Sequence, residues 1–168
     1  MDYTFPVVGG RITSNFGPRI APTAGASTDH KGIDIAVPAG TPVMAALSGI
    51  IKVAGYNKSY GNYVTVVHGD GLETTYKHLS KVLTPKGGTA VLEGQQIGLS
   101  GNSGTSTGPH LDFSIWQNGK AVDRLKFNLP GGSLFNFAGG LDTNSFLTVV
   151  KGKWWLIAGA LVIIAVLK

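Results

Sequence analysis

GIIKVAGYNKSYGNYVTVVHGDGLETTYKHL, residues 49–79, decides the fold class. β-branched and aromatic residues fill three runs in this stretch, Gly49–Tyr56, Tyr63–Gly69 and Glu73–Leu79. The segments between the runs are short and rich in Gly, Asn and Asp, which favour tight turns. Strands joined by turns this short pair with their neighbours in the opposite direction. The stretch therefore predicts antiparallel hairpins.

The same pattern extends in both directions from these hairpins. Further short runs bounded by Gly and Pro predict strands at Gly32–Ala36, Pro42–Ala46, Gln96–Ser100 and Leu111–Gln117. Residues 1–29 indicate one strand followed by a loop. Glycine is abundant, with 25 residues, and only 14% of residues are charged, which favours a β-domain with many turns over a helical one. We expect an all-β fold, an antiparallel sheet or barrel-sandwich hybrid.

The 168 residues are enough for one domain with a core and too few for two ordinary ones. We expect a domain over residues 1–126, a connector over 127–150 and a C-terminal hydrophobic helix over 151–168. The core of that helix is the run 154–167, fourteen consecutive apolar residues with lysines on both sides. Fourteen helical residues span about 21 Å, less than the roughly 30 Å of a bilayer's hydrocarbon, so a full crossing needs residues from Phe146 onward. Insertion into a membrane is the favoured interpretation, and a buried helix of a soluble domain is the alternative.

Net charge argues against nucleic acid as a partner. The chain carries a formal charge of +5, but three of its lysines flank the C-terminal run, and residues 1–150 hold 11 basic against 9 acidic groups. A net charge of +2 on the domain is too small for a nucleic-acid-binding surface. Cysteine is absent, which leaves His, Asp and Glu as the side chains that could hold a metal.

Three of the four histidines stand in contexts typical of metal sites. His30 precedes Asp34 in an H-x-x-x-D pattern, His78 ends a predicted strand, and His110 precedes Asp112 in an H-x-D pattern. Residues two apart on a strand project from the same face, so His110 and Asp112 should point together. One H-x-D is weak support for a metal, because a hydrogen-bonded pair is commoner, but three such clusters framed by glycine are more specific.

The chain resembles the lysostaphin-type, or LytM-type, zinc metalloendopeptidases. The stretches that carry the resemblance are HKGIDIAVPAGTPVMAALSGII, YGNYVTVVHGDGLETTYKHLS and EGQQIGLSGNSGTSTGPHLDFSIW, which together with the residues between them cover about 95 of the 168 residues. The resemblance implies a duplicated hybrid motif of antiparallel sheet. It also implies a zinc-dependent endopeptidase that hydrolyses peptide cross-links of bacterial peptidoglycan.

By position, the resemblance implies that His30 and Asp34 bind zinc and that His78 and His110 are catalytic. The family's third ligand is the second His of an H-x-H, a position that Asp112 occupies here. A carboxylate can bind zinc, but two carboxylates neutralise the ion, so we expect a less acidic bound water, a higher pH optimum and tolerance for Mn²⁺. Arg19, Asn62 and Thr107 are candidates for substrate binding, although a surface salt bridge explains Arg19 equally well.

The residues leave two other functions open. Asp112 could mark a non-catalytic, degenerate domain that binds the cell wall or activates another hydrolase. The second alternative, a carrier or sugar-transfer domain, would need an acceptor Lys or a pair of phosphorylatable histidines. The intact H-x-x-x-D pattern disfavours this class of protein. His68, at a hairpin end, is expected to be a solvated or capping residue. The glycines at 98, 101, 104 and 108 indicate turns before the His110 strand, since no G-K-[ST] follows.

The first six residues lack the basic and apolar regions of a signal peptide. A wall hydrolase made in the cytoplasm and attached to a membrane by its C-terminus suggests a bacteriophage whose virion contains lipid. In that hypothesis the enzyme opens the wall for delivery of the genome. There are two alternatives: a bacterial membrane protein that faces the cell wall, and a lysis enzyme that is released late in infection.

Overall fold

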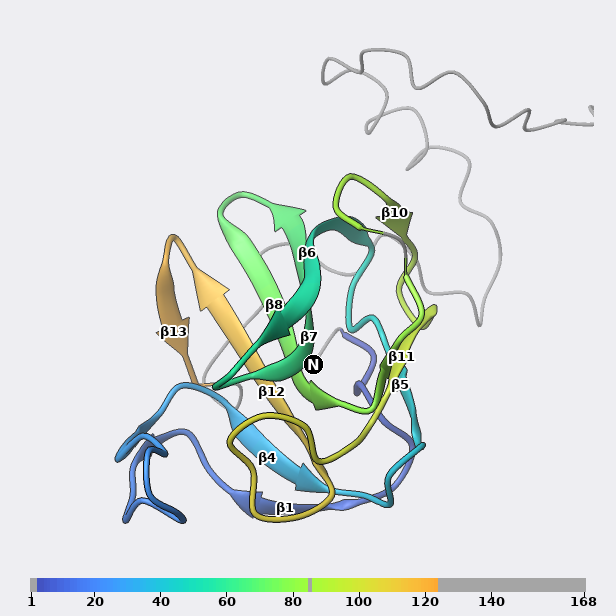
Figure 1. Cartoon of the computed structure of the whole chain (residues 1–168). Coiled ribbons are helices and arrows are strands. Elements are labelled where there is room, and N and C mark those ends of the chain that lie inside the picture. Colours follow the sequence, from blue (N-terminus) through green and yellow to red (C-terminus); the bar gives the residue numbers. More distant parts are fainter. Residues whose placement is uncertain (1–2, 85, 124–168) are drawn as a thin grey trace, which may run out of the picture. The chain divides into compact units, whose positions relative to one another are not determined.

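A computed structural model describes residues 3–84 and 86–123, and every regular element within them is a β-strand (Figure 1). The strands are β1 Arg11–Ser14, β2 Gly17–Pro18, β3 Asp29–His30, β4 Ile33–Ala36, β5 Pro42–Met44, β6 Gly49–Asn57, β7 Gly61–Gly69, β8 Leu72–Leu79, β9 Lys81–Val82, β10 Ala90–Val91, β11 Gln96–Leu99, β12 His110–Gln117 and β13 Lys120–Val122. The expected all-β class is confirmed. Each of the seven strands predicted between residues 32 and 117 is present, with ends within two residues of those predicted.

The sequence patterns did not indicate the two-residue strands β2, β3, β9 and β10, or the short β13. The expected connector 127–150, the C-terminal helix 151–168 and the membrane-inserting run 154–167 lie outside the described residues. Within the residues that are described, no helix is long and apolar enough to cross a membrane.

The strands form one large sheet and two small ones. The large sheet has the order β1-β4-β12-β8-β7-β6-β10, with β13 paired to β12. A second sheet has the order β5-β11-β9, and β2 pairs with β3. All pairs are antiparallel, as the short turns predicted. Figure 1 shows β4, β12 and β8 side by side, and these three strands carry much of the site described below.

Alternation along β12 separates the two faces of the large sheet. Leu111, Phe113 and Ile115 are buried in the hydrophobic core, while Asp112 and Trp116 belong to the opposite face. Each fully buried side chain of this size contributes about 1.5–3 kcal/mol to folding. One face of the sheet is therefore committed to the core, and the other is free to carry polar chemistry.

His68 differs from its expectation as a solvated or capping residue. It is half-buried, with Nδ1 2.9 Å from the Ser48 carbonyl and Nε2 2.7 Å from Thr74 Oγ1. Thr74 in turn bonds the buried Tyr76 hydroxyl, which accepts a hydrogen bond from the Ala46 N–H at 2.7 Å. Burial lowers the pKa of His68 and raises that of Tyr76 to about 12. With both ring nitrogens engaged inside the protein, His68 is a structural residue.

Candidate metal centre

Three side chains from three strands meet on the polar face of the large sheet. Asp34 on β4 and Asp112 on β12 are direct cross-strand partners, and His30 lies at the end of β3. His30 Nε2 is 3.2 Å from Asp34 Oδ1 and 3.7 Å from Asp112 Oδ2. One possible ligand atom from each residue lies within 4.8 Å of the other two. This is the set of metal ligands expected from the sequence.

His30 shows that these residues fit a metal ion. Its Nδ1–H donates to the Asn15 carbonyl at 3.1 Å, which leaves Nε2 as the inward nitrogen. Nε2 is buried and has no hydrogen-bond partner, although two carboxylates lie close to it. Buried polar atoms nearly always have a partner, so an unpartnered nitrogen facing two carboxylate oxygens indicates a place for a cation. Anchoring of the other ring nitrogen is also typical of histidines that bind metals.

His78 and His110 face the same centre. His78 Nδ1–H donates to the Ser103 carbonyl at 2.8 Å, and His110 Nδ1–H donates to the Gly108 carbonyl at 2.7 Å. Their Nε2 atoms lie 4.0 Å from Asp112 Oδ2 and 3.6 Å from Asp34 Oδ1, respectively. The two rings are 4.8 Å apart between centroids. The backbone therefore orients both histidines so that Nε2 of each ring faces the two carboxylates.

The backbone at His78 breaks the alternation of β8. Its φ is +61°, in the left-handed region that non-glycine residues seldom adopt. Successive strand residues normally point to opposite faces, yet Lys77 and His78 both approach Asp112. The unusual φ is thus the means by which two neighbouring residues reach one site.

Ser103 is a residue of the candidate site that the sequence did not indicate. Besides its carbonyl bond to His78, its hydroxyl donates to the Leu79 carbonyl at 2.7 Å. Gly61 and Gly104 allow this loop to approach, because a Cβ on Gly61 would overlap Ser103 and one on Gly104 would overlap Gly61. The glycine at 104 was interpreted only as a turn residue, and the close approach across strands was not visible in the sequence.

Charges around the centre set its protonation state without metal. Burial alone would lower the pKa of His30, but the adjacent Asp112 and Asp34 carboxylates outweigh it and raise that pKa to about 9. Burial would raise the pKa of both carboxyl groups, yet Lys77 and His30 hold the pKa of Asp112 well below its usual range, and His30 lowers that of Asp34. Burial lowers the pKa of His78, which keeps its imidazole neutral and able to accept a proton.

Each carboxylate is also held by a cation. Arg19 Nη1 donates to Asp34 Oδ2 at 2.7 Å, while Asp34 Oδ1 faces the histidines. Lys77 Nζ lies 3.2 and 3.1 Å from Asp112 Oδ1 and Oδ2. The salt bridge considered for Arg19 is present, but within the site. Lys77 was not identified from the sequence, because its role depends on pairing between β8 and β12.

The centre opens into a cavity of about 520 Å³. Arg19 and Thr107, both candidates for substrate binding, line it together with His78, His110 and Asp112. Asn62 is not among the described residues that line this cavity.

Asn62 instead supports the end of β8. Its Nδ2 donates to the Leu79 carbonyl at 3.0 Å, and its backbone N–H donates to Ser103 Oγ at 2.9 Å. It holds in place the two segments that carry and orient His78.

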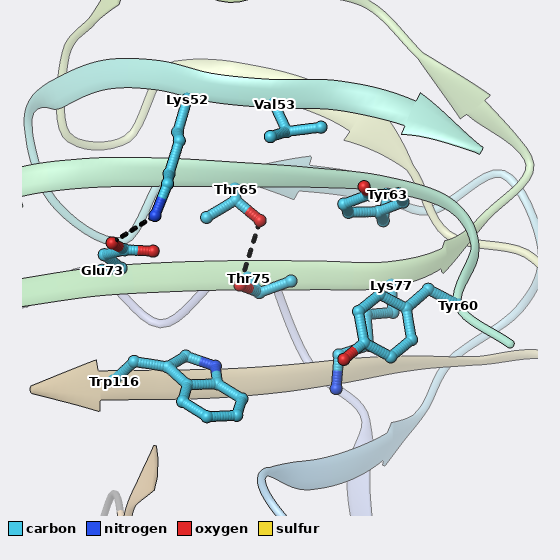
Figure 2. Close-up of a pocket in the computed structure, with 9 residues that line it drawn as sticks. All are labelled: Lys52, Val53, Tyr60, Tyr63, Thr65, Glu73, Thr75, Lys77 and Trp116. Carbon is cyan, nitrogen blue, oxygen red and sulfur yellow. Dashed lines mark hydrogen bonds and ion pairs between the residues drawn. The ribbon is translucent and has the colours of Figure 1, made fainter. Parts of the chain in front are cut away.

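A second, smaller pocket of about 240 Å³ continues along the same face of the sheet. Figure 2 shows Tyr60 and Lys77 at one end, Trp116 on β12, and the Lys52–Glu73 ion pair at the far end. Lys77 lines this pocket and contacts Asp112, which lines the larger cavity. The two hollows are therefore neighbours.

Comparisons with known proteins identify the family of the chain. The sequence profile of peptidase family M23 matches residues 28–124. The peptidoglycan DD-endopeptidase ShyA of Vibrio cholerae is 44% identical over 121 residues, which cover 71% of this chain and 28% of that protein. The chain thus spans little more than a quarter of this curated relative.

Solved structures show the same fold. A zinc-containing peptidase from Vibrio cholerae matches with a TM-score of 0.69 and 36% identity, over 77% of this chain and 41% of that one. The catalytic domain of lysostaphin from Staphylococcus simulans matches with a TM-score of 0.62 and 35% identity, over 69% and 90%. With its fold, its His and Asp cluster and a profile that matches more than half of its residues, the chain belongs to peptidase family M23.

Proposed function

We propose that the chain is a zinc-dependent endopeptidase that hydrolyses peptide cross-links of bacterial peptidoglycan. The observation that carries this proposal is the convergence of three histidine Nε2 atoms and two carboxylates on one centre at the floor of a cavity. The similarity to ShyA, a peptidoglycan DD-endopeptidase, supports the choice of substrate.

His30, Asp34 and Asp112 would hold the zinc ion. When bound, zinc polarises a peptide carbonyl and makes water a stronger acid. Oxygen donors also suit harder ions, so Mn²⁺ is a second ion worth testing. Lys77 contributes a positive charge beside Asp112, which adds to the charge balance of the two carboxylates and the ion.

His78 and His110 would perform the proton transfers. Neutral Nε2 of one imidazole accepts a proton from the attacking water, and the protonated ring then donates to the leaving amine. The carbonyl groups of Ser103 and Gly108 keep each ring in the tautomer with a free Nε2. This division of labour leaves the two carboxylates and His30 to the metal.

The substrate peptide would lie along the polar face of the sheet. Arg19 and Thr107 line the cavity beside the metal ligands, and Trp116 lines the neighbouring pocket. Trp116 is four residues along β12 from Asp112, a distance of about 13 Å, or four residues of an extended peptide. Of the candidates for substrate binding, Arg19 and Thr107 are proposed to contact the substrate and Asn62 to support His78.

The test combines metal analysis with hydrolysis. The purified full chain should contain about one zinc per molecule and clear a suspension of peptidoglycan sacs, releasing free amines. His78→Ala should keep the zinc and lose at least about a hundredfold in rate, since general base catalysis contributes on that scale. His68→Gln is the matched control and should stay active. A zinc-free wild type, or an active His78→Ala, would refute the assignment.

One observation favours the second candidate, a non-catalytic wall-binding domain. Lys77 occupies both oxygens of Asp112, as a lysine that replaces a metal would do. In that case wild type would bind peptidoglycan sacs without zinc and without releasing amines. The same experiment therefore separates the two functions.

For location, we propose that residues 154–167 attach the domain to a lipid membrane, either that of a bacteriophage virion or a bacterial membrane facing the cell wall. Support comes from the uninterrupted apolar run and its flanking lysines. The full chain should float with liposomes, and a chain truncated after residue 150 should not. If mass spectrometry does not detect the chain in purified virions, the proposed location in the virion is excluded.

A further inference from the structure

The register of the large sheet places three charges in one row. Asp34 on β4 is opposite Asp112 on β12, and Asp112 is opposite Lys77 on β8. Like charges directly opposite each other destabilise a sheet, whereas opposite charges stabilise it. Asp112 is therefore flanked by a repelling carboxylate on one strand and an attracting ammonium on the other.

Lys77 is unusually well enclosed for a lysine. It is 5% exposed and Asp112 is 7% exposed, and Nζ contacts both carboxylate oxygens at 3.1–3.2 Å. The ring of Tyr60 covers Nζ, with its centroid 4.7 Å away, a favourable place for a cation. By contrast, the Lys52–Glu73 pair at the far end of the same pocket is half-exposed at its lysine. The position of Lys77 is thus set by packing and by charge.

This pair changes the charge of the centre. A divalent ion bound by one imidazole and two carboxylates is formally neutral, whereas one carboxylate with two imidazoles leaves +1. Lys77 adds one positive charge in direct contact with Asp112 and brings the total back to +1. Arg19 pairs with Asp34, and its contribution to the net charge does not depend on which residue occupies position 112.

We propose that Lys77 offsets the negative charge of Asp112, so that the centre keeps the electrostatics of a one-carboxylate zinc site. The proposal rests on zinc binding in the proposed function. With a neutral histidine at position 112, the ion and its ligands would keep a net charge of +1. With Asp112 in that position, Lys77 restores this net charge. Asp112 and Lys77 then form one functional unit across two strands.

The test measures zinc affinity of the full chain in detergent at one pH, by competition with a chromogenic chelator. A unit charge that is separated from the ion by a single carboxylate group changes zinc affinity by on the order of tenfold to a hundredfold. Lys77→Met should therefore bind zinc at least about tenfold more tightly, although its metal-free form is less stable because a buried carboxylate loses its partner. Lys77→Arg keeps the charge and should stay within about threefold of wild type. Lys52→Met is the matched control and should leave zinc affinity unchanged.

A purely structural role for Lys77 predicts the opposite sign. If Lys77→Met binds zinc more weakly than wild type, or equally, the proposal is wrong. If that variant does not fold, Asp112→His and the double variant Lys77→Met/Asp112→His decide. The double variant should bind at least about tenfold more tightly than Asp112→His, and a smaller gain overturns the proposal. A wild type without zinc affinity would instead refute the proposed function, so the two failures are distinguishable.

Discussion

Zinc binding to this chain should release one proton near neutral pH, and His30 should be its source. The Asp112 and Asp34 carboxylates raise the pKa of His30 to about 9, so at pH 7 the metal-free ring is protonated. A metal requires the neutral imidazole, so the ion must displace that proton. Asp34 and Asp112 contribute none, because their pKa values are lowered and they are already ionised.

The expected magnitude follows from the pKa of His30. A proton held with a pKa of about 9 weakens apparent zinc affinity about a hundredfold at pH 7, or about 3 kcal/mol. Between pH 7 and 8 the apparent dissociation constant should fall about ninefold. Calorimetry in several buffers of different ionisation enthalpy should report about one proton released per zinc at pH 7. Release of less than about 0.3 proton, with an affinity that does not change over this range, would refute the reasoning.

The raised pKa of His30 also predicts how the stability of the metal-free protein depends on pH. The folded pKa of His30 lies above its unfolded value of 6.5, so its contribution to stability is complete below pH 6.5 and is lost as pH rises through 9. This contribution is at most about 3 kcal/mol. The rise in melting temperature caused by zinc should therefore grow from pH 6.5 to 9. If the rise in melting temperature caused by zinc is the same at every pH, His30 is not the group that titrates.

Three further variants test the fold and the groove. Gly104→Ala should lose about 1–3 kcal/mol of unfolding free energy, because its Cβ overlaps the neighbouring strand; Gly25→Ala, with a similar positive φ but open space, should lose less. Tyr76→Phe should cost about 1–3 kcal/mol in chemical denaturation, since a buried N–H loses its acceptor, whereas Tyr56→Phe, 65% exposed, should be neutral. Trp116→Ala should raise KM by roughly fivefold or more and leave kcat within about twofold if the second pocket binds peptide, and an unchanged KM would exclude that role.

Local patterns along the chain, together with the family resemblance, predicted the longer strands and the residues that meet at the candidate metal centre. Runs of β-branched and aromatic residues bounded by turn residues predicted seven strands. The H-x-x-x-D and H-x-D patterns pointed to metal-type clusters, the family resemblance assigned His30, Asp34 and Asp112 as ligands, and these three residues converge in the structure. Each of these signals lies within a few consecutive residues. Short strands such as β3 and β9 were missed because their position depends on packing against distant segments.

The partners of these residues could not be read in the same way, because they depend on contacts across strands. Arg19 is fifteen residues from Asp34, Lys77 is thirty-five from Asp112, and Ser103 is twenty-five from His78. No local pattern distinguishes Lys77 from an exposed lysine until the register places it opposite Asp112. For the same reason the sequence alone left open that Asp112 marks a degenerate domain, because its partner Lys77 is not apparent from local patterns. A substitution in a metal site can be interpreted only together with the residues that the sheet places beside it. Here the departure at 112 and the lysine at 77 form one unit, because neither is stable in a buried position without the other.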